Sequence, residues 1–112
     1  MEVQKLKLKE NNILVAIFGN EIDKISNKIT GNIELDIENQ MQFIEHINTI
    51  IDDGHHNIII SMNNISYIDS SGLWAIFESH KKIEQRNGKI VLLKPKKDVK
   101  RVLDITKIST KI

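Results

Sequence analysis

Hydrophobic and polar positions change their spacing several times along the chain. Residues 3–9 alternate apolar and charged side chains, which is typical of an edge strand with one exposed face. A turn signal, Asn11-Asn12, separates this segment from the apolar run 13–18. We therefore predict an antiparallel hairpin at the start of the chain. Residues 24–35 are polar with isolated isoleucines, and this pattern leaves a third short strand and an ordered loop both open.

A helical period begins at Asp36 and predicts a helix that ends before Gly54. Asp36 and Glu38 place negative charge at its start, where the helix macrodipole favours it, and Gly54 suits a left-handed C-terminal cap. The apolar stripe of this helix is expected to contain Ile37, Met41, Ile44, Ile47, Asn48 and Ile51, with Phe43 and Ile50 widening it.

The rest of the chain continues an alternation of strands and helices. Residues 58–62 are apolar on both faces, as in a central parallel strand. Residues 73–86 have helical spacing, residues 89–93 predict a further buried strand, and Asp98 is the expected cap of a last helix. The stripe of the middle helix is expected to contain Leu73, Ile76, Phe77, His80 and Ile83. The predicted fold class is α/β: a mixed sheet with an N-terminal antiparallel hairpin, then parallel βα units, with helices packed on it.

Composition limits the function classes. A length of 112 residues fits one domain over residues 1–112. Isoleucine supplies 22 residues and cysteine none, which excludes disulfides, thiolate metal sites and thiol nucleophiles. Aromatic residues make up only 4%, which argues against binding single-stranded nucleic acid by base stacking. Neither a secretory signal core nor a run long enough for a membrane span is present, so a cytoplasmic protein without membrane contact is expected.

The small net charge of +1 conceals an asymmetry. Residues 1–56 hold 5 lysines and 10 acidic residues, a net charge of −5, whereas residues 57–112 carry a net charge of +6. This predicts a dipolar surface with the basic half beginning near residue 57. For the basic segment 94–101, a solvated helix start and a contact with an acidic partner both remain open. His55 and His56 are adjacent in a predicted turn, and the sequence pattern offers no third metal ligand beside them, so no metal site is predicted.

The tetrapeptide Asp69-Ser70-Ser71-Gly72 is the candidate site. It lies between a predicted strand and a helix N-terminus, where unpaired N–H groups and the positive end of the dipole favour anions. A serine at this place can cap the helix, hold a phosphate or be phosphorylated itself, and either Asp69 or Ser70 can be the cap. A hydrolase would need a Gly-x-Ser-x-Gly elbow and a base, and the first glycine is missing. Neither catalytic residues nor a cofactor are predicted.

Residues 58–73 resemble the signature of STAS domains of the anti-sigma factor antagonist type, in which an apolar strand leads to Asp-Ser-Ser/Thr-Gly-Leu at the start of a helix. Residues 88–93 and 99–105 are similar to the following strand and helix of that family, and residues 9–15 to its opening hairpin. The resemblance thus covers most of the chain.

The resemblance implies a function as a phosphorylation-controlled binding protein, not an enzyme. By it, Ser70 is the phosphorylation site, and Asp69, Ser71, Gly72 and Trp74 belong to the partner-binding region. The implied partners are an anti-sigma factor that is also a serine kinase, which the unphosphorylated form binds, and a PP2C-like phosphatase. The alternative is a STAS accessory subunit of a transporter or signalling scaffold that is not phosphorylated. The oligomeric state is not predicted.

The chain departs from the family pattern at three places. Trp74 stands where a small residue commonly follows Gly-Leu, and it either packs at the flank of the core or anchors a partner. The family's glycine closely followed by aspartate occurs twice, in 19–23 and 31–36, which implies an inserted strand or loop within 24–35. Because the sequence stops at Ile112, the C-terminal helix of the family is expected to be missing or replaced.

Overall fold

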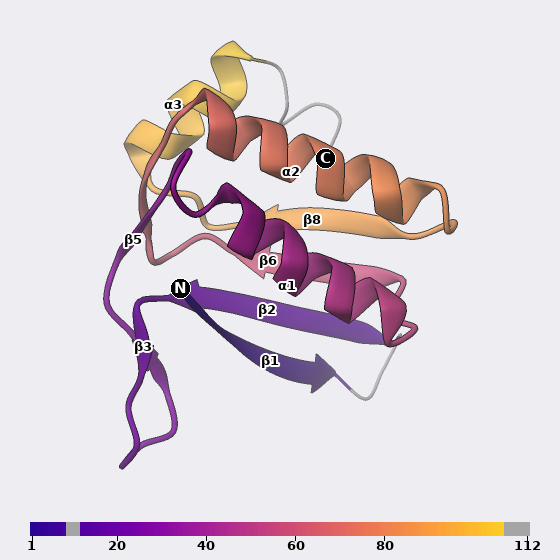
Figure 1. Cartoon of the computed structure of the whole chain (residues 1–112), viewed down its shortest axis with the longest axis horizontal. Coiled ribbons are helices and arrows are strands. Elements are labelled where there is room, and N and C mark those ends of the chain that lie inside the picture. The colour runs from indigo at the N-terminus through magenta and orange to yellow at the C-terminus, as the bar shows by residue number, and fades with distance from the viewer. Residues whose placement is uncertain (9–11, 107–112) are drawn as a thin grey trace.

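The N-terminal hairpin forms one side of a four-stranded mixed sheet (Figure 1). In the computed structural model, which describes residues 1–8 and 12–106, β1 (Glu2–Leu8) pairs antiparallel with β2 (Ile13–Gly19). β2 pairs in parallel with β6 (Asn57–Ser61), and β6 in parallel with β8 (Lys89–Leu93). The predicted hairpin, central strand and mixed α/β sheet are confirmed. The turn residues 9–11 lie outside the described residues.

Two smaller strand pairs account for most of the segment that the sequence left open. β3 (Glu21–Ile22) and β4 (Ile29–Thr30) form a short antiparallel hairpin, and β5 (Ile33–Leu35) pairs in parallel with β7 (Ile65–Ile68). Of the two Gly…Asp patterns, it is therefore the second, 31–36, that leads into a helix. That the hairpin is an insertion relative to the family stays a prediction.

Three helices complete the described chain: α1 (Gln40–Asp52), α2 (Ser70–Glu84) and α3 (Lys97–Ile105). α1 and α2 lie side by side over one face of the sheet, and α3 packs against β7 (Figure 1). The core lies between the helices and this face; the rings of Phe18 and Phe43 approach to 4.8 Å between centroids. Its largest fully buried side chains are Phe18, Phe43, Leu14, Leu35, Ile47, Ile50, Ile51, Ile58, Ile60, Met62, Ile65 and Ile76. None of the described helices is long and apolar enough to cross a bilayer.

The predicted start of α1 is wrong by one helical turn. Asp36 Oδ1 accepts hydrogen bonds from the N–H groups of Glu38 (3.0 Å) and Asn39 (3.3 Å), which hold residues 36–39 in a turn. Consequently Asp36 and Glu38 precede the helix, whose first turn has no acidic residue. The buried stripe consists of Phe43, Ile47, Ile50 and Ile51, whereas Ile37 and Met41 are exposed. Gly54 has a φ of +96°, which confirms the expected left-handed cap.

α2 begins at Ser70, directly after the cap candidate Asp69 and three residues before its predicted apolar stripe starts at Leu73. The predicted cap of α3 is wrong: the N-cap is Lys96, and Asp98 lies inside the first turn. His80 is buried on α2 with its Nε2 3.1 Å from Glu84 Oε1. The predicted replacement of the C-terminal helix concerns residues from 107 onward, which lie outside the described residues.

Candidate functional site

The first turn of α2 lies at the carboxyl end of the sheet, beside the segment that leads into α1 (Figure 1). β7 ends at Ile68, Asp69 makes the connection, and Ser70 is the first helical residue. The parallel β5–β7 pairing, with Leu35 opposite Ile68, brings the two approaches to α1 and α2 together. The site therefore consists of two chain segments that are far apart in the sequence.

Asp69 is the cap of α2. Its backbone is extended (φ −106°, ψ −173°), and its Oδ1 accepts a hydrogen bond of 2.9 Å from the N–H of Gly72. Its carbonyl accepts the first intrahelical bond, from the N–H of Leu73 at 3.0 Å, and its own N–H donates to the carbonyl of Leu35 at 3.2 Å. Of the two cap candidates, Asp69 thus fulfils the structural role.

We expect Asp69→Ala to lower the free energy of unfolding by about 1 kcal/mol, because the N–H of Gly72 loses its acceptor. Asp69→Asn keeps an oxygen at the same place and is expected to lose less than half of that. Urea denaturation of the three proteins measures both values. Equal losses for alanine and asparagine would contradict the capping role.

Gly72 is required by a close backbone approach. It is buried, and a Cβ atom at this position would lie 2.2 Å from the carbonyl oxygen of Leu35 and 2.8 Å from Cγ1 of Ile68. Neither neighbour can withdraw easily, since one is backbone and the other belongs to the core. Glycine therefore lets the first turn of α2 rest directly on β5.

Ser70 differs from its neighbours because the fold makes no use of its side chain. It is exposed, and within the described part of the chain its hydroxyl makes no hydrogen bond, whereas Ser71 is half-buried. Because Asp69 supplies the cap, the Ser70 hydroxyl is available to another molecule.

Trp74 lies one helical turn after Ser70 and therefore on the same side of α2. Its side chain is 46% exposed, so a large part of the ring faces solvent. The predicted site residues Asp69, Ser70, Ser71, Gly72 and Trp74 are thus brought together at one helix end. Four of them reach the surface at least partly, and Gly72 does not.

Sequence reasoning did not predict that the segment before α1 lies beside the candidate site. Ile37 and Met41, which the periodicity assigned to the core, are 68% and 53% exposed at the helix end beside the start of α2. A signal was present, because Asp36 followed three residues later by Asn39 is typical of a local turn that delays a helix.

Charges of both signs flank the start of α2. The segment that Asp69 contacts carries Glu34, Asp36 and Glu38, while the basic helix α3 packs against β7 on the other side. The side chain of Lys96 reaches Asn32, with 3.2 Å between Nζ and Oδ1. The wholly basic surroundings suggested by the charge of residues 57–112 are therefore not found at Ser70.

Comparison with known proteins agrees with this geometry. The sequence model of the STAS domain matches residues 21–112. A Thermotoga maritima protein described as a candidate anti-sigma factor antagonist has a similar structure, with a TM-score of 0.74 at 22% identity over 96% of this chain and 80% of its own. The anti-sigma factor antagonist SpoIIAA in its unphosphorylated form has a TM-score of 0.62 at 23% identity, covering 92% of this chain and 82% of its own.

The phosphorylated form of the Bacillus cell fate determinant SpoIIAA is similar as well, with a TM-score of 0.63 at 21% identity, covering 97% of this chain and 86% of its own. At these identities the solved structures show the shared fold, while the family match extends over most of the sequence and includes the Asp-Ser-Ser-Gly turn. The chain therefore belongs to the STAS domain family.

Proposed function

We propose that this chain is an anti-sigma factor antagonist whose binding to its partner is controlled by phosphorylation of Ser70. The observation that carries the proposal is the exposed Ser70 hydroxyl, which makes no hydrogen bond within the described residues while Asp69 caps the helix. The similarity to SpoIIAA, whose structures include an unphosphorylated and a phosphorylated form, supports it.

Phosphorylation of Ser70 is compatible with the folded state. A phosphate adds about −1.5 to −2 charges, and the first turn of a helix offers unpaired N–H groups and the positive end of the dipole. The cap bond from Gly72 to Asp69 does not involve the Ser70 side chain and persists. The phosphate therefore changes the surface and leaves the packing of α2 on β5 intact.

The same charge acts against a bound partner. A protein that packs on the first turn of α2 covers Ser70 together with the exposed ring of Trp74, and it must desolvate whatever Ser70 carries. Glu34, Asp36 and Glu38 belong to the adjoining segment, whose Leu35 carbonyl accepts a hydrogen bond from the Asp69 N–H, so the phosphate stands beside like charges. Release on phosphorylation follows from repulsion and from the cost of desolvation.

The remaining predicted residues have distinct parts in this proposal. Asp69 and Ser71 border the contact surface, and the buried Gly72 supports it by keeping α2 close to β5. The proposed partner is a cytoplasmic anti-sigma factor that also acts as a serine kinase, and a PP2C-like phosphatase restores the binding form.

A phosphorylation assay tests the proposal. The protein is incubated with ATP and each candidate anti-sigma kinase of the host, and its intact mass is then measured. We expect the wild type and Ser71→Ala to gain the mass of one phosphoryl group, and Ser70→Ala to gain none. Ser71→Ala is the matched control because it removes the neighbouring hydroxyl from the same turn.

Two outcomes would refute the assignment: no phosphoryl transfer to the wild type from any of these kinases, or equal labelling of Ser70→Ala. Co-purification of an unmodified protein with a permease or its ATPase would instead favour an accessory subunit of a transporter.

A further inference from the structure

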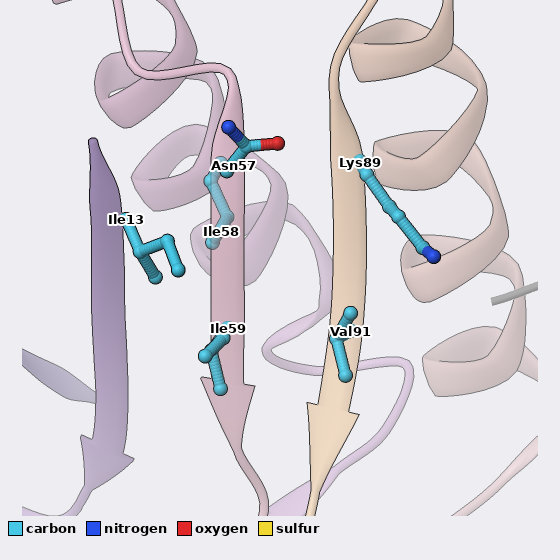
Figure 2. Close-up of a pocket in the computed structure, with 6 residues that line it drawn as sticks. All are labelled: Ile13, Asn57, Ile58, Ile59, Lys89 and Val91. Carbon is cyan, nitrogen blue, oxygen red and sulfur yellow. The ribbon is translucent and has the colours of Figure 1, made fainter. Parts of the chain in front are cut away.

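The sheet has a second face, opposite α1 and α2, that no described helix covers. Figure 2 views β2, β6 and β8 from this side, with the helices behind them. The molecule is only 22 Å thick along its shortest axis, which corresponds to one sheet and one layer of helices. We call this side the open face.

The strand register defines which residues the open face presents. Residues directly opposite one another on neighbouring strands point to the same side of the sheet. The rows that contain the buried residues of β2 point to the core, and the alternate rows point to the open face. The open face accordingly consists of three rows: Leu8, Ile13, Asn57 and Lys89; Leu6, Val15, Ile59 and Val91; and Gln4, Ile17, Ser61 and Leu93. Glu2 continues the β1 column by one more position. At this end the β3–β4 hairpin borders the face: the Gln4 side chain donates to the Asn27 carbonyl at 2.8 Å and accepts from the Ile29 N–H at 3.4 Å.

Eight of these twelve positions are aliphatic, although a sheet face in contact with water normally carries polar side chains. Leu6, Leu8, Val91 and Leu93 are 39–47% exposed. A hollow of about 230 Å³ lies among Ile13, Ile59 and Val91, with Asn57 and Lys89 at its edge (Figure 2). A continuous exposed apolar surface of this kind marks an interface.

The charges on the open face indicate what covers it. Lys89, at the start of β8, and Glu2, at the start of β1, are both exposed and stand at diagonally opposite corners, since β1 and β8 are the two edge strands. A two-fold axis in the plane between two such faces, with the strands crossing at near right angles, places Lys89 of each copy on Glu2 of the other. The open face of one copy therefore complements the open face of a second copy, because both are apolar sheet surfaces and their opposite charges meet.

We propose that the open face joins two copies of this chain in a symmetric dimer, with two Glu2–Lys89 ion pairs between the copies. With strands about 4.8 Å apart and a rise of about 3.3 Å per residue, the face buries on the order of 1,000 Å² over both copies. This is the lower end of the range for specific interfaces, so the dimer dissociates on dilution.

The dimer goes beyond the proposed function and does not depend on it. The hollow lies at the starts of β2, β6 and β8, whereas Ser70 lies at the other end of the sheet and on the side of the helices (Figure 1). Both Ser70 residues of a dimer therefore stay accessible.

Sedimentation velocity over a series of protein concentrations tests the proposal. We expect a reversible monomer–dimer equilibrium whose dissociation constant rises about tenfold in Glu2→Lys and in Lys89→Glu, because each change turns two attractive pairs into repulsive ones. The double exchange, Glu2→Lys with Lys89→Glu, restores the wild-type value. Lys97→Glu, an exposed charge reversal on α3, is the control and leaves it unchanged.

A second variant tests the apolar part of the face. Val91→Lys is expected to abolish the dimer, and its far-ultraviolet circular dichroism checks that the 39% exposed position tolerates lysine. A wild-type protein that is monomeric at every concentration would overturn the proposal. So would a dimer that the single charge reversals and Val91→Lys leave unchanged, or single reversals that the double exchange fails to rescue.

Discussion

Gly72→Ala is expected to lower the free energy of unfolding by about 3 kcal/mol or more, a large part of the stability of a domain of this size. The added methyl group would meet the Leu35 carbonyl oxygen at 2.2 Å and Ile68 at 2.8 Å, so α2 must move away from β5. That movement also lengthens the bond between the Asp69 N–H and the Leu35 carbonyl. Urea or thermal denaturation measures the loss.

Gly54→Ala is the matched control. Gly54 has a φ of +96°, but no heavy atom lies within 4 Å of the place that a Cβ atom would take, so alanine adds backbone strain without a clash. We expect a loss of about 1–2 kcal/mol there. A Gly72→Ala protein no less stable than Gly54→Ala would show that the contact of α2 with β5 is not tight.

Ser70→Asp is expected to weaken binding to the anti-sigma factor about 100-fold or more. The carboxylate places an unpaired charge where the partner excludes water, which typically costs about 3–5 kcal/mol. The melting temperature is expected to change by less than about 3 °C, since the position is exposed and Asp69 remains the cap. Titration calorimetry with the partner and a thermal melt measure the two effects.

Ser70→Asn separates charge from size. Asparagine has nearly the shape of aspartate and no charge, so we expect it to keep binding within about tenfold of the wild type, and that difference is assigned to the side chain's bulk. If asparagine and aspartate weaken binding equally, repulsion is not the cause of release. A large loss of stability in Ser70→Asp would show that Ser70 has a structural role in the helix start.

Local patterns predicted the parts of the fold that depend on short-range periodicity. The hairpin, the central strand at Asn57–Ser61 and the succession of strands and helices follow from the spacing of apolar residues. The predicted start of α1 was wrong because the Asp36 side chain accepts hydrogen bonds from the backbone N–H groups of Glu38 and Asn39 and holds them in a turn. The spacing of apolar residues does not reveal such side-chain bonds. β3, β4 and β5 are two or three residues long and exist through pairing with other segments, which a local pattern does not contain.

For the candidate site, the sequence predicted the residues but not which of them caps the helix and which is left exposed. Either Asp69 or Ser70 fitted the cap, and the extended backbone of Asp69 and the bond from the Gly72 N–H to its Oδ1 distinguish them. Ile37 is exposed because it precedes α1, so the error in the helix start concealed it. Met41 lies within α1 but off its buried stripe, which apolar spacing alone did not locate.

The pairing of β5 with β7 has a consequence for the order of folding. The chain between Leu35 and Ile68 contains α1 and β6, so closing this pair requires a long loop, whereas only four residues of sequence separate β1 from β2. The β5–β7 pair, on which the first turn of α2 rests, is thus expected to form after the β1–β2 hairpin. A nascent or partly unfolded chain would then display the Ser70 sequence without the rigid surface around it, and recognition of that surface would select for the fully folded protein.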